Sequence, residues 1–296
     1  MNWNTNADQN PRDLTFFPAC TRYVRVSIAR LRAGYTHYVS RRIRRMREES
    51  RLLVKNSPPK TEAARLVNNI SNISGLANVR YLEIGVERGF TFQDVDAKLK
   101  IGVDPKFKFN KRIKGSGIKL FEIESETYFS SHAKAEVFDI VFLDGLHTAS
   151  QTYADFKNVL LHVHEKSFII IDDTVPCDEF SAIPNQQESY IQRSKANKIG
   201  DGSWHGDVFK VILALTKLED SPLEFATIKD FNNPKTVIWL KPNTLWPRDL
   251  NSYEEFRAEY SDYFDEDFIH ASFKPVSESD FYTLLLPGVN RENHDL

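Results

Sequence analysis

Six acidic residues in this chain each stand where a short apolar stretch ends, and their type points to binding chemistry. They are Glu83, Asp104, Glu124, Asp144, Asp172 and Asp173. Carboxylates that gather in one place bind a hard divalent cation, the hydroxyl groups of a ribose or a positively charged ligand. If the apolar stretches are parallel strands, their carboxyl ends meet at one edge of a sheet, where ligands bind in such folds. We therefore expect an acidic rim along that edge.

The stretch over residues 79–104 contains the turn that would position two of these acids. It has the pattern of a strand, a glycine turn, a short helix and a second strand. Gly85 and Gly89 flank a turn in which the backbone comes close to a ligand, and Thr91 is placed to cap the helix that follows. Glu87 occupies the position of the second glycine in a dinucleotide-binding motif, where its charge opposes a phosphate. The turn favours a cationic ligand, and a strand–turn–helix unit without a ligand is the alternative.

The rest of the central region alternates between strand and helix patterns. Apolar runs over residues 118–123, 137–145 and 167–171 predict three more strands, and residues 61–73 and 150–163 have helical spacing. Strands that alternate with helices predict an α/β fold with a doubly wound, mostly parallel sheet.

The region after these strands has three parts. Residues 176–203 are polar with little pattern, and we expect them to form an active-site lid or insertion. Residues 204–218 predict a helix. Residues 225–230 and 236–240 predict an antiparallel hairpin that completes the sheet.

Composition divides the chain into three expected parts. These are a basic amphipathic helical extension over residues 1–58, the α/β domain over residues 59–242 and an acidic, aromatic tail over residues 243–296. Ten arginines lie within residues 22–51. One interpretation is a basic helix in peripheral contact with an anionic membrane. The other is a solvated arginine face on a helix that packs on the domain or on a second copy of the chain, which would make a homo-oligomer.

Overall charge and cysteine content narrow the class of protein. Lys and Arg number 39 and Asp and Glu 41, so no global field points to a polyanionic partner. No aromatic-interleaved RNA motif accompanies the arginines, and we expect no nucleic acid partner. Cys20 and Cys177 lack metal-ligand spacing and favour a reducing compartment. No apolar run has the length of a membrane span. The expected location is the cytoplasm, with peripheral membrane contact through residues 22–51 left open.

Five runs of residues together resemble one family of enzymes. They are L-E-I-G-V-E-R-G-F-T (82–91), G-V-D (102–104), F-L-D-G-L-H-T (142–148), I-I-I-D-D-T (169–174) and W-H-G-D-V-F-K (204–210). These runs are similar to class I S-adenosylmethionine-dependent methyltransferases, and among them to the methyltransferase domain 24 group and the bacterial sugar O-methyltransferases. The resemblance covers about residues 59–242 and implies a Rossmann-like methyltransferase fold with a seven-stranded sheet.

The resemblance also implies roles for individual residues. S-adenosylmethionine would be bound by Glu83, Gly85, Gly89, Thr91, Asp104, Glu124, Ser125 and Asp144. A Mg²⁺ ion would be bound by Asp144, Asp172 and Asp173 and would hold two vicinal hydroxyls of the acceptor. Adjacent strand residues point to opposite faces, so Asp172 and Asp173 can both reach the ion only if the backbone turns there. Otherwise one of them caps the next helix and the other pairs with an arginine.

The catalytic base is the least defined role. The sugar-methylating relatives carry a second acid at the position of Leu146. His147 follows this position and titrates in the range needed to accept a hydroxyl proton, with His205 as the second candidate. Asp207 and Lys210 would touch the acceptor, or Asp207 would cap the helix that follows it.

The expected function is methyl transfer from S-adenosylmethionine to a hydroxyl group of a small-molecule or glycan acceptor, and the expected acceptor is a sugar or glycan-type hydroxyl. The reaction would be a single in-line displacement, with or without Mg²⁺. A non-catalytic or membrane-associated scaffold of a glycan-biosynthesis cluster, which keeps the fold, is the alternative from another class. A nicotinamide oxidoreductase is disfavoured by Glu87.

Overall fold

The computed structural model describes residues 61–111, 113, 115–198, 202–218, 220–247, 250 and 272–286. The chain divides into two units, Met1–Pro59 and Lys60–Leu296, and every described residue belongs to the second. The basic extension expected over residues 1–58 lies outside the described residues, as does the aromatic part of the tail over residues 251–271. No helix of the described ranges has the length and apolarity needed to cross a membrane.

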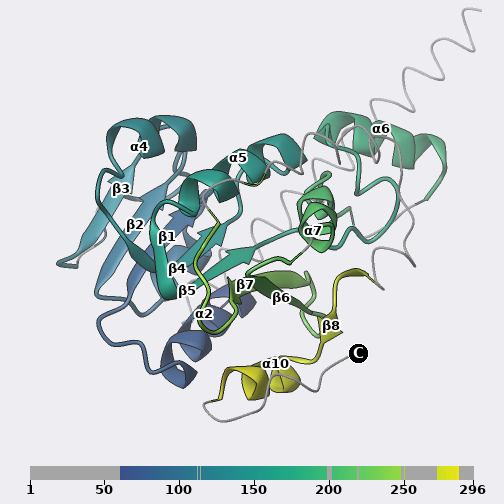
Figure 1. Cartoon of the computed structure of the whole chain (residues 1–296). Coiled ribbons are helices and arrows are strands. Elements are labelled where there is room, and N and C mark those ends of the chain that lie inside the picture. The colour runs from purple at the N-terminus through teal and green to yellow at the C-terminus, as the bar shows by residue number, and fades with distance from the viewer. Residues whose placement is uncertain are drawn as a thin grey trace, which may run out of the picture. The chain divides into compact units, whose positions relative to one another are not determined.

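An eight-stranded sheet organises the second unit (Figure 1). Its strands are β1 (Arg80–Ile84), β2 (Leu99–Val103), β3 (Ile118–Phe121), β4 (Phe138–Leu143), β5 (Val163–Ile171), β6 (Leu223–Ile228), β7 (Lys235–Leu240) and β8 (Pro275–Val276). They lie side by side in the order β3-β2-β1-β4-β5-β7-β6-β8. The first five in this order run parallel, β7 is antiparallel to both neighbours and β8 is parallel to β6. The predicted doubly wound, mostly parallel sheet is confirmed, with one strand more than the seven expected.

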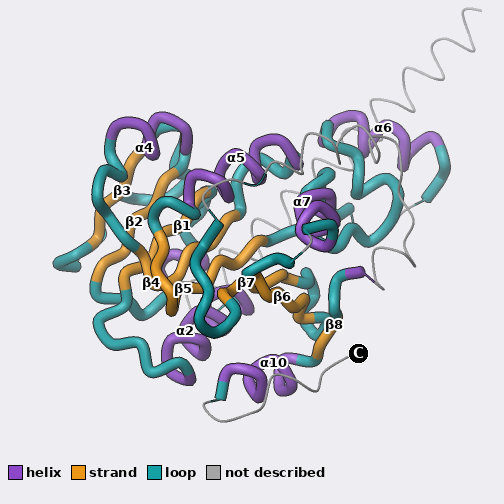
Figure 2. Tube along the Cα trace, viewed as in Figure 1, coloured by secondary structure: helices purple, strands orange, loops and turns teal. Residues whose placement is uncertain are grey.

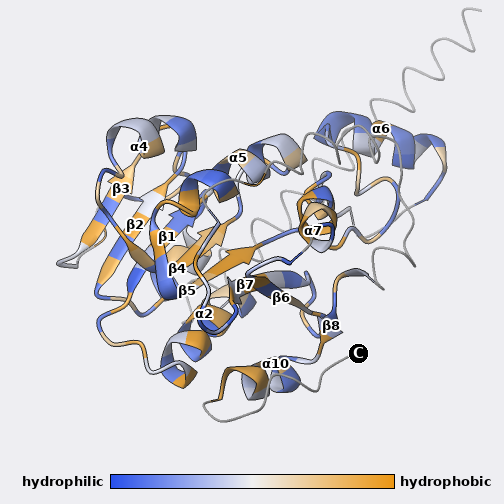
Figure 3. Cartoon of the chain, in the orientation of Figure 1, coloured by the Kyte–Doolittle hydropathy of each residue, from blue (hydrophilic) through white to orange (hydrophobic). Residues whose placement is uncertain are grey.

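Helices cover both faces of this sheet (Figure 2). Those of the described residues are α2 (Glu62–Ile73), α3 (Phe90–Asp94), α4 (Ser125–Ser131), α5 (Ala149–Val159), α6 (Gln186–Lys195), α7 (Phe209–Thr216) and α10 (Glu278–Leu285). One core contains α4, α5 and α7 with Leu82 and Val141 of the strands. The other contains α2, α3 and α10 with Tyr81 and Phe142. Because alternate strand residues enter opposite cores, both faces of the central strands are apolar (Figure 3).

Side-chain caps fix the starts of four helices. The capping residues are Thr61 before α2, Thr148 before α5, Asn185 before α6 and Ser277 before α10, and each accepts a hydrogen bond from the backbone N–H three residues later. Each such cap contributes about 1 kcal/mol. The predicted cap at Thr91 is wrong: α3 begins after Gly89, which has a left-handed φ of 70°, and the Thr91 hydroxyl lies 3.2 Å from that of Thr61.

Three predicted boundaries also differ from the structure. Helix α5 ends at Val159 and β5 already begins at Val163, because residues 160–162 form a tight turn. The segment over residues 176–203 contains α6, which its polar composition concealed since only Ser189 and Arg193 of that helix are buried. The helix predicted from residue 204 begins at Phe209.

Candidate active site

Acidic side chains lie at the carboxyl ends of the parallel strands, as predicted. Glu83 is the last but one residue of β1, Asp104 follows β2, Asp144 follows β4, and Asp172 and Asp173 follow β5. All are buried except Asp144, whose side chain is one-third exposed. We call Asp144, Asp172 and Asp173, which come from two neighbouring strands, the rim carboxylates. Glu124 follows β3 at the start of α4 and makes no side-chain cap there.

Glu83 is the most deeply buried of these acids. Its exposed fraction is 2%, and the Tyr81 hydroxyl donates a 2.6 Å hydrogen bond to Oε2. Burial raises the pKa of Glu83 to about 8 despite that hydrogen bond. Glu83 therefore holds a proton at neutral pH.

The glycine turn is tied to the neighbouring strands. Gly85 has φ of 89°, and a Cβ atom there would lie 1.8 Å from the carbonyl oxygen of Asp144. Only glycine permits this close approach, because both the space and the backbone conformation exclude a side chain. Gly85 thus allows the ends of β1 and β4 to pack closely, in addition to the ligand-binding role expected from the sequence.

Asp104 fixes the other side of the same turn. Its Oδ2 accepts a hydrogen bond of 2.8 Å from the backbone N–H of Glu87, and its Oδ1 accepts one of 2.6 Å from that of Lys106. A carboxylate has about four acceptor sites, so Asp104 retains capacity for a ribose hydroxyl. The Glu87 side chain is half-exposed and lies 2.6 Å from the Lys108 ammonium. The sequence predicted that the charge of Glu87 would repel a phosphate, and this ion pair weakens that repulsion.

His147 lies between two rim carboxylates. Its Nε2 is 3.3 Å from Asp144 Oδ1 and 3.0 Å from Asp173 Oδ2. Its Nδ1 donates to the carbonyl oxygen of Trp204 at 3.2 Å, and the Trp204 ring stacks on the imidazole at 4.8 Å between centroids. Burial opposes a charge on the imidazole, but the hydrogen bonds to Asp144 and Asp173 outweigh it and raise the pKa of His147 to about 11. His147 is therefore an imidazolium held at both nitrogens.

Asp172 and Asp173 face different partners. The backbone turns at Asp173, which has a left-handed φ of 57°, so the condition set for two adjacent carboxylates is met. Asp173 reaches His147, whereas Asp172 Oδ1 is 2.8 Å from the ammonium of Lys235 and 2.9 Å from Nδ2 of Asn233. Lys235 is 4% exposed. A lysine, not the arginine considered from the sequence, compensates Asp172.

The predicted three-carboxylate Mg²⁺ set does not fit this arrangement. Among the described residues, the ligand atoms within 4.8 Å of one another belong to Asp144, His147 and Asp173. Asp172 is bonded to Lys235 instead. Mg²⁺ prefers an octahedral shell of oxygen atoms, and an imidazole nitrogen suits transition metals better.

Trp204 and Gly206 lie against His147, in a segment that the sequence indicated only as the run W-H-G-D. The backbone N–H groups of His205 and Gly206 both donate to the carbonyl oxygen of Ser181, at 3.0 and 2.8 Å. Nε2 of His205 is 3.8 Å from Asp173 Oδ1, which is too long for a hydrogen bond. His205, the second candidate base, therefore lies beside Asp173 without a hydrogen bond to it. Sequence reasoning gave Trp204 no role of its own and did not find Lys235.

Asp207 caps a helix, but not the one expected. Its Oδ1 accepts a 2.7 Å hydrogen bond from the backbone N–H of Ala149, the first residue of α5, and its Oδ2 is 3.1 Å from the Lys210 ammonium. Helix α7, which follows Asp207, has no side-chain cap. Asp207 thus joins the start of α5 to the segment that carries Trp204.

The Ser125 side chain turns toward α5. Gln151 Nε2 donates to Ser125 Oγ at 3.1 Å and to Asp155 Oδ1 at 3.2 Å. Burial raises the pKa of Asp155 to about 6. The cofactor role predicted for Glu124 and Ser125 stays a prediction.

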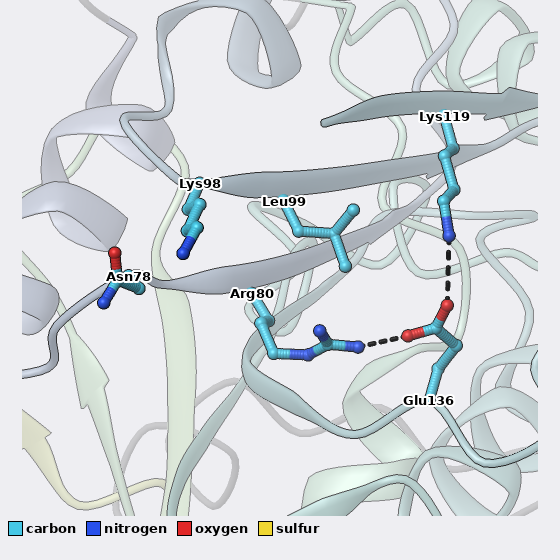
Figure 4. Close-up of a pocket in the computed structure, with 6 residues that line it drawn as sticks. All are labelled: Asn78, Arg80, Lys98, Leu99, Lys119 and Glu136. Atoms are coloured by element: carbon cyan, nitrogen blue, oxygen red, sulfur yellow. Dashed lines mark hydrogen bonds and ion pairs between the residues drawn. The ribbon is translucent and has the colours of Figure 1, made fainter. Parts of the chain in front are cut away.

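A hollow of about 450 Å³ lies at the opposite, amino-terminal edge of the sheet (Figure 4). Its lining consists of Asn78, Arg80, Lys98, Leu99, Lys119 and Glu136. Glu136 forms ion pairs with Arg80 and with Lys119, the latter at 3.1 Å. The hollow contains none of the rim carboxylates.

One family of known proteins matches part of the described region. A family model described as a methyltransferase domain matches residues 82–174, which run from β1 through the glycine turn to the residue after Asp173. No curated protein matches the chain. The solved structures that resemble it include a putative O-methyltransferase from Klebsiella pneumoniae, with 14% identity over 65% of this chain and 95% of that one and a TM-score of 0.36.

Two further solved structures come from biosynthetic pathways. The O-methyltransferase TomG of Streptomyces achromogenes, involved in tomaymycin synthesis and bound to S-adenosylmethionine, has 12% identity over 62% of this chain and 91% of that one, with a TM-score of 0.37. MycE, from mycinamycin biosynthesis, was solved with Mg, S-adenosylhomocysteine and mycinamycin VI. It has 16% identity over 66% of this chain and 56% of that one, with a TM-score of 0.42. At these values none of the three indicates an acceptor for this chain.

Proposed function

We propose that this chain, whose residues 82–174 match a methyltransferase domain, transfers a methyl group from S-adenosylmethionine to a hydroxyl group of a small-molecule or glycan acceptor. Its enzyme class, an S-adenosylmethionine-dependent methyltransferase, follows from that domain. The observation that supports the proposed chemistry most is the position of His147 between Asp144 and Asp173 at the ends of β4 and β5. Ligands of doubly wound sheets bind at that edge.

The cofactor would lie over the glycine turn. Its sulfonium group is positive, and the three rim carboxylates outnumber the two cations beside them, His147 and Lys235. Asp104 would accept hydrogen bonds from the ribose, and Gly85 and Gly89 keep the turn free of side chains. The methyl group is then held in line with an acceptor oxygen, and positioning of this kind supplies most of the rate enhancement.

Asp144 is the proton acceptor in this proposal. Burial and the negative charge of Asp172 raise the pKa of Asp144 to about 7, so its carboxylate exchanges a proton at neutral pH, as a general base must. His147 stays protonated and bonded at both nitrogens, and we assign it the role of holding Asp144 and Asp173 in place. The sequence expectation made His147 itself the base, with His205 as its alternative.

A sugar is the acceptor class that we propose. Leu146, between Asp144 and His147, is 63% exposed, which is unusual for a leucine at a site of charged groups. The C–H face of a sugar ring can pack on such a side chain while a hydroxyl meets Asp144.

The first test is calorimetric titration of the full chain with S-adenosylmethionine. We expect binding in the wild type and at least about tenfold weaker binding in Asp104→Asn, because hydrogen bonds to the charged group are lost. Glu136→Gln, at the opposite edge of the sheet, is the matched control and should bind like the wild type. A wild type that gives no heat contradicts the proposal.

The second test is a screen of sugar acceptors with the wild type, Asp144→Asn and His147→Gln. Loss of the general base should lower kcat by about 10²- to 10⁴-fold in Asp144→Asn with cofactor affinity retained. His147→Gln should shift the pH profile of kcat, because the charge beside Asp144 is removed. Full kcat in Asp144→Asn would rule out its role as the base.

A non-catalytic scaffold is the second candidate function. It is favoured by Leu146, which stands where the sugar-methylating relatives carry a second acid. This candidate predicts no cofactor binding in the same titration.

A further inference from the structure

Lys235 brings a buried positive charge to the rim at the place where a metal ion was expected. It is the first residue of β7, and the next residue, Thr236, pairs with Ile171 at the end of β5. Because β7 runs antiparallel to β5, its start lies beside the carboxyl end of β5 (Figure 1). The topology therefore puts Lys235 next to Asp172, where its side chain is excluded from solvent.

One carboxylate oxygen of Asp172, Oδ1, already accepts three hydrogen bonds. They come from Lys235 Nζ at 2.8 Å, from Asn233 Nδ2 at 2.9 Å and from the backbone N–H of Asp173 at 2.9 Å. Lys235 Nζ also donates to the carbonyl oxygen of Asn233 at 3.1 Å. A divalent cation could coordinate this oxygen only by displacing the ammonium. That would leave a buried lysine without its counter-charge, which is strongly unfavourable.

We propose that Lys235 replaces the metal ion in this chain: its ammonium neutralises Asp172, no divalent cation binds at the rim, and methyl transfer needs no added metal. The catalytic part of this inference rests on the proposed function. The metal-binding part does not, and it can be measured on the protein alone.

Without a metal ion the range of acceptors becomes wider. A metal ion that chelates an acceptor requires two vicinal hydroxyls, whereas a fixed ammonium on Asp172 does not. The acceptor then needs one hydroxyl within reach of Asp144. Acceptors with an isolated hydroxyl should be methylated as well as those with a vicinal pair.

The experiment uses Mn²⁺ as the probe, because its paramagnetic resonance signal is lost on binding. With the full wild-type chain we expect the signal of free Mn²⁺ and the same thermal midpoint in millimolar Mg²⁺ as in EDTA. Stoichiometric Mn²⁺ binding that disappears in Asp144→Asn would overturn the inference.

Variants at Lys235 provide the complementary test. Lys235→Met removes the ammonium, and its thermal midpoint should become higher in Mg²⁺ than in EDTA, since the cation now compensates Asp172. The double variant Lys235→Met, Asp172→Asn removes both charges and should fold without any response to metal. Lys210→Met is the matched control: Lys210 is also buried and lies 3.1 Å from an aspartate, Asp207. Its midpoint should fall equally in both buffers. An Mg²⁺ response in the double variant, or none in folded Lys235→Met, counts against the inference.

Failure of this inference can be told apart from failure of the proposed function. Cofactor titration of the same sample is performed in EDTA and in Mg²⁺. Binding that requires Mg²⁺ overturns the metal-free inference and leaves the methyltransferase proposal standing. No cofactor binding in either buffer contradicts the methyltransferase proposal, and the Mn²⁺ result still decides the metal question.

Discussion

A methyl group added at Gly206 should separate two segments of the site and destabilise the fold. Its φ is 64°, and a Cβ atom there would lie 1.6 Å from the carbonyl oxygen of His147. An ordinary contact begins at 3.4 Å, so Gly206→Ala forces the two segments apart by about 1.8 Å. The backbone N–H bonds of His205 and Gly206 to Ser181 and the stacking of Trp204 on His147 depend on that closeness.

The expected loss follows from these contacts. Two backbone hydrogen bonds contribute about 1 kcal/mol each, and a left-handed backbone costs a residue with a side chain about 1 kcal/mol. Gly206→Ala should therefore lower the free energy of unfolding by roughly 3 kcal/mol. Gly75→Ala is the matched control, because Gly75 has φ of 63° and no atom within 4 Å of its added Cβ. It should lose only about 1 kcal/mol.

Urea unfolding of both variants, with unchanged m values, measures the comparison. The difference of about 2 kcal/mol corresponds to roughly 4 to 8 °C in Tm for a domain of this size. Equal losses in the two variants would refute the reasoning, because the backbone conformation alone would then account for both.

Three other predictions concern buried and exposed charges. Burial raises the pKa of Glu83 from 4.5 to about 8. Between these values the unfolded chain has lost the proton and the folded protein keeps it, so the free energy of unfolding falls by roughly 5 kcal/mol as pH rises through this window. Glu83→Gln should flatten this decline in unfolding experiments across pH. Asp207→Ala should lower the free energy of unfolding by about 2 kcal/mol, because the N–H of Ala149 loses its acceptor. Urea unfolding measures this change, and a decrease below about 0.5 kcal/mol would contradict the capping role. Glu278→Gln, in the exposed ion pair with Arg65 between α10 and α2, should cost less than about 1 kcal/mol, and a larger loss would show that this pair is not screened by solvent.

The sequence predicted the part of the site that depends on local pattern. An apolar run followed by an acid identifies a strand end, and this placed Asp104, Asp144 and Asp173 correctly at one edge. Gly85 was found because a turn between strand and helix needs its conformation. Its main constraint, the carbonyl of Asp144, comes from a strand that lies some sixty residues away and left no local signal.

The remainder depends on pairs that are distant in the sequence. The partner of Asp172 is Lys235, which comes from the hairpin more than sixty residues later in the chain, and no spacing rule connects the two. Asp207 was expected to cap its own helix because sequence reasoning considers neighbours first, yet it caps α5. The short helix α6 has no apolar stripe because its buried side chains are Ser189 and Arg193, so periodicity had nothing to detect.

Strand β8 makes the far end of the chain part of the fold. Residues 275–276 pair with β6, and α10 packs on the core beside α2, although both lie in the segment first regarded as a tail after residue 242. A recombinant fragment cut at residue 242 would leave β6 with unpaired backbone groups and would uncover apolar surface under Phe281. Such a fragment should be recovered from inclusion bodies, so expression trials ought to keep residues 272–286.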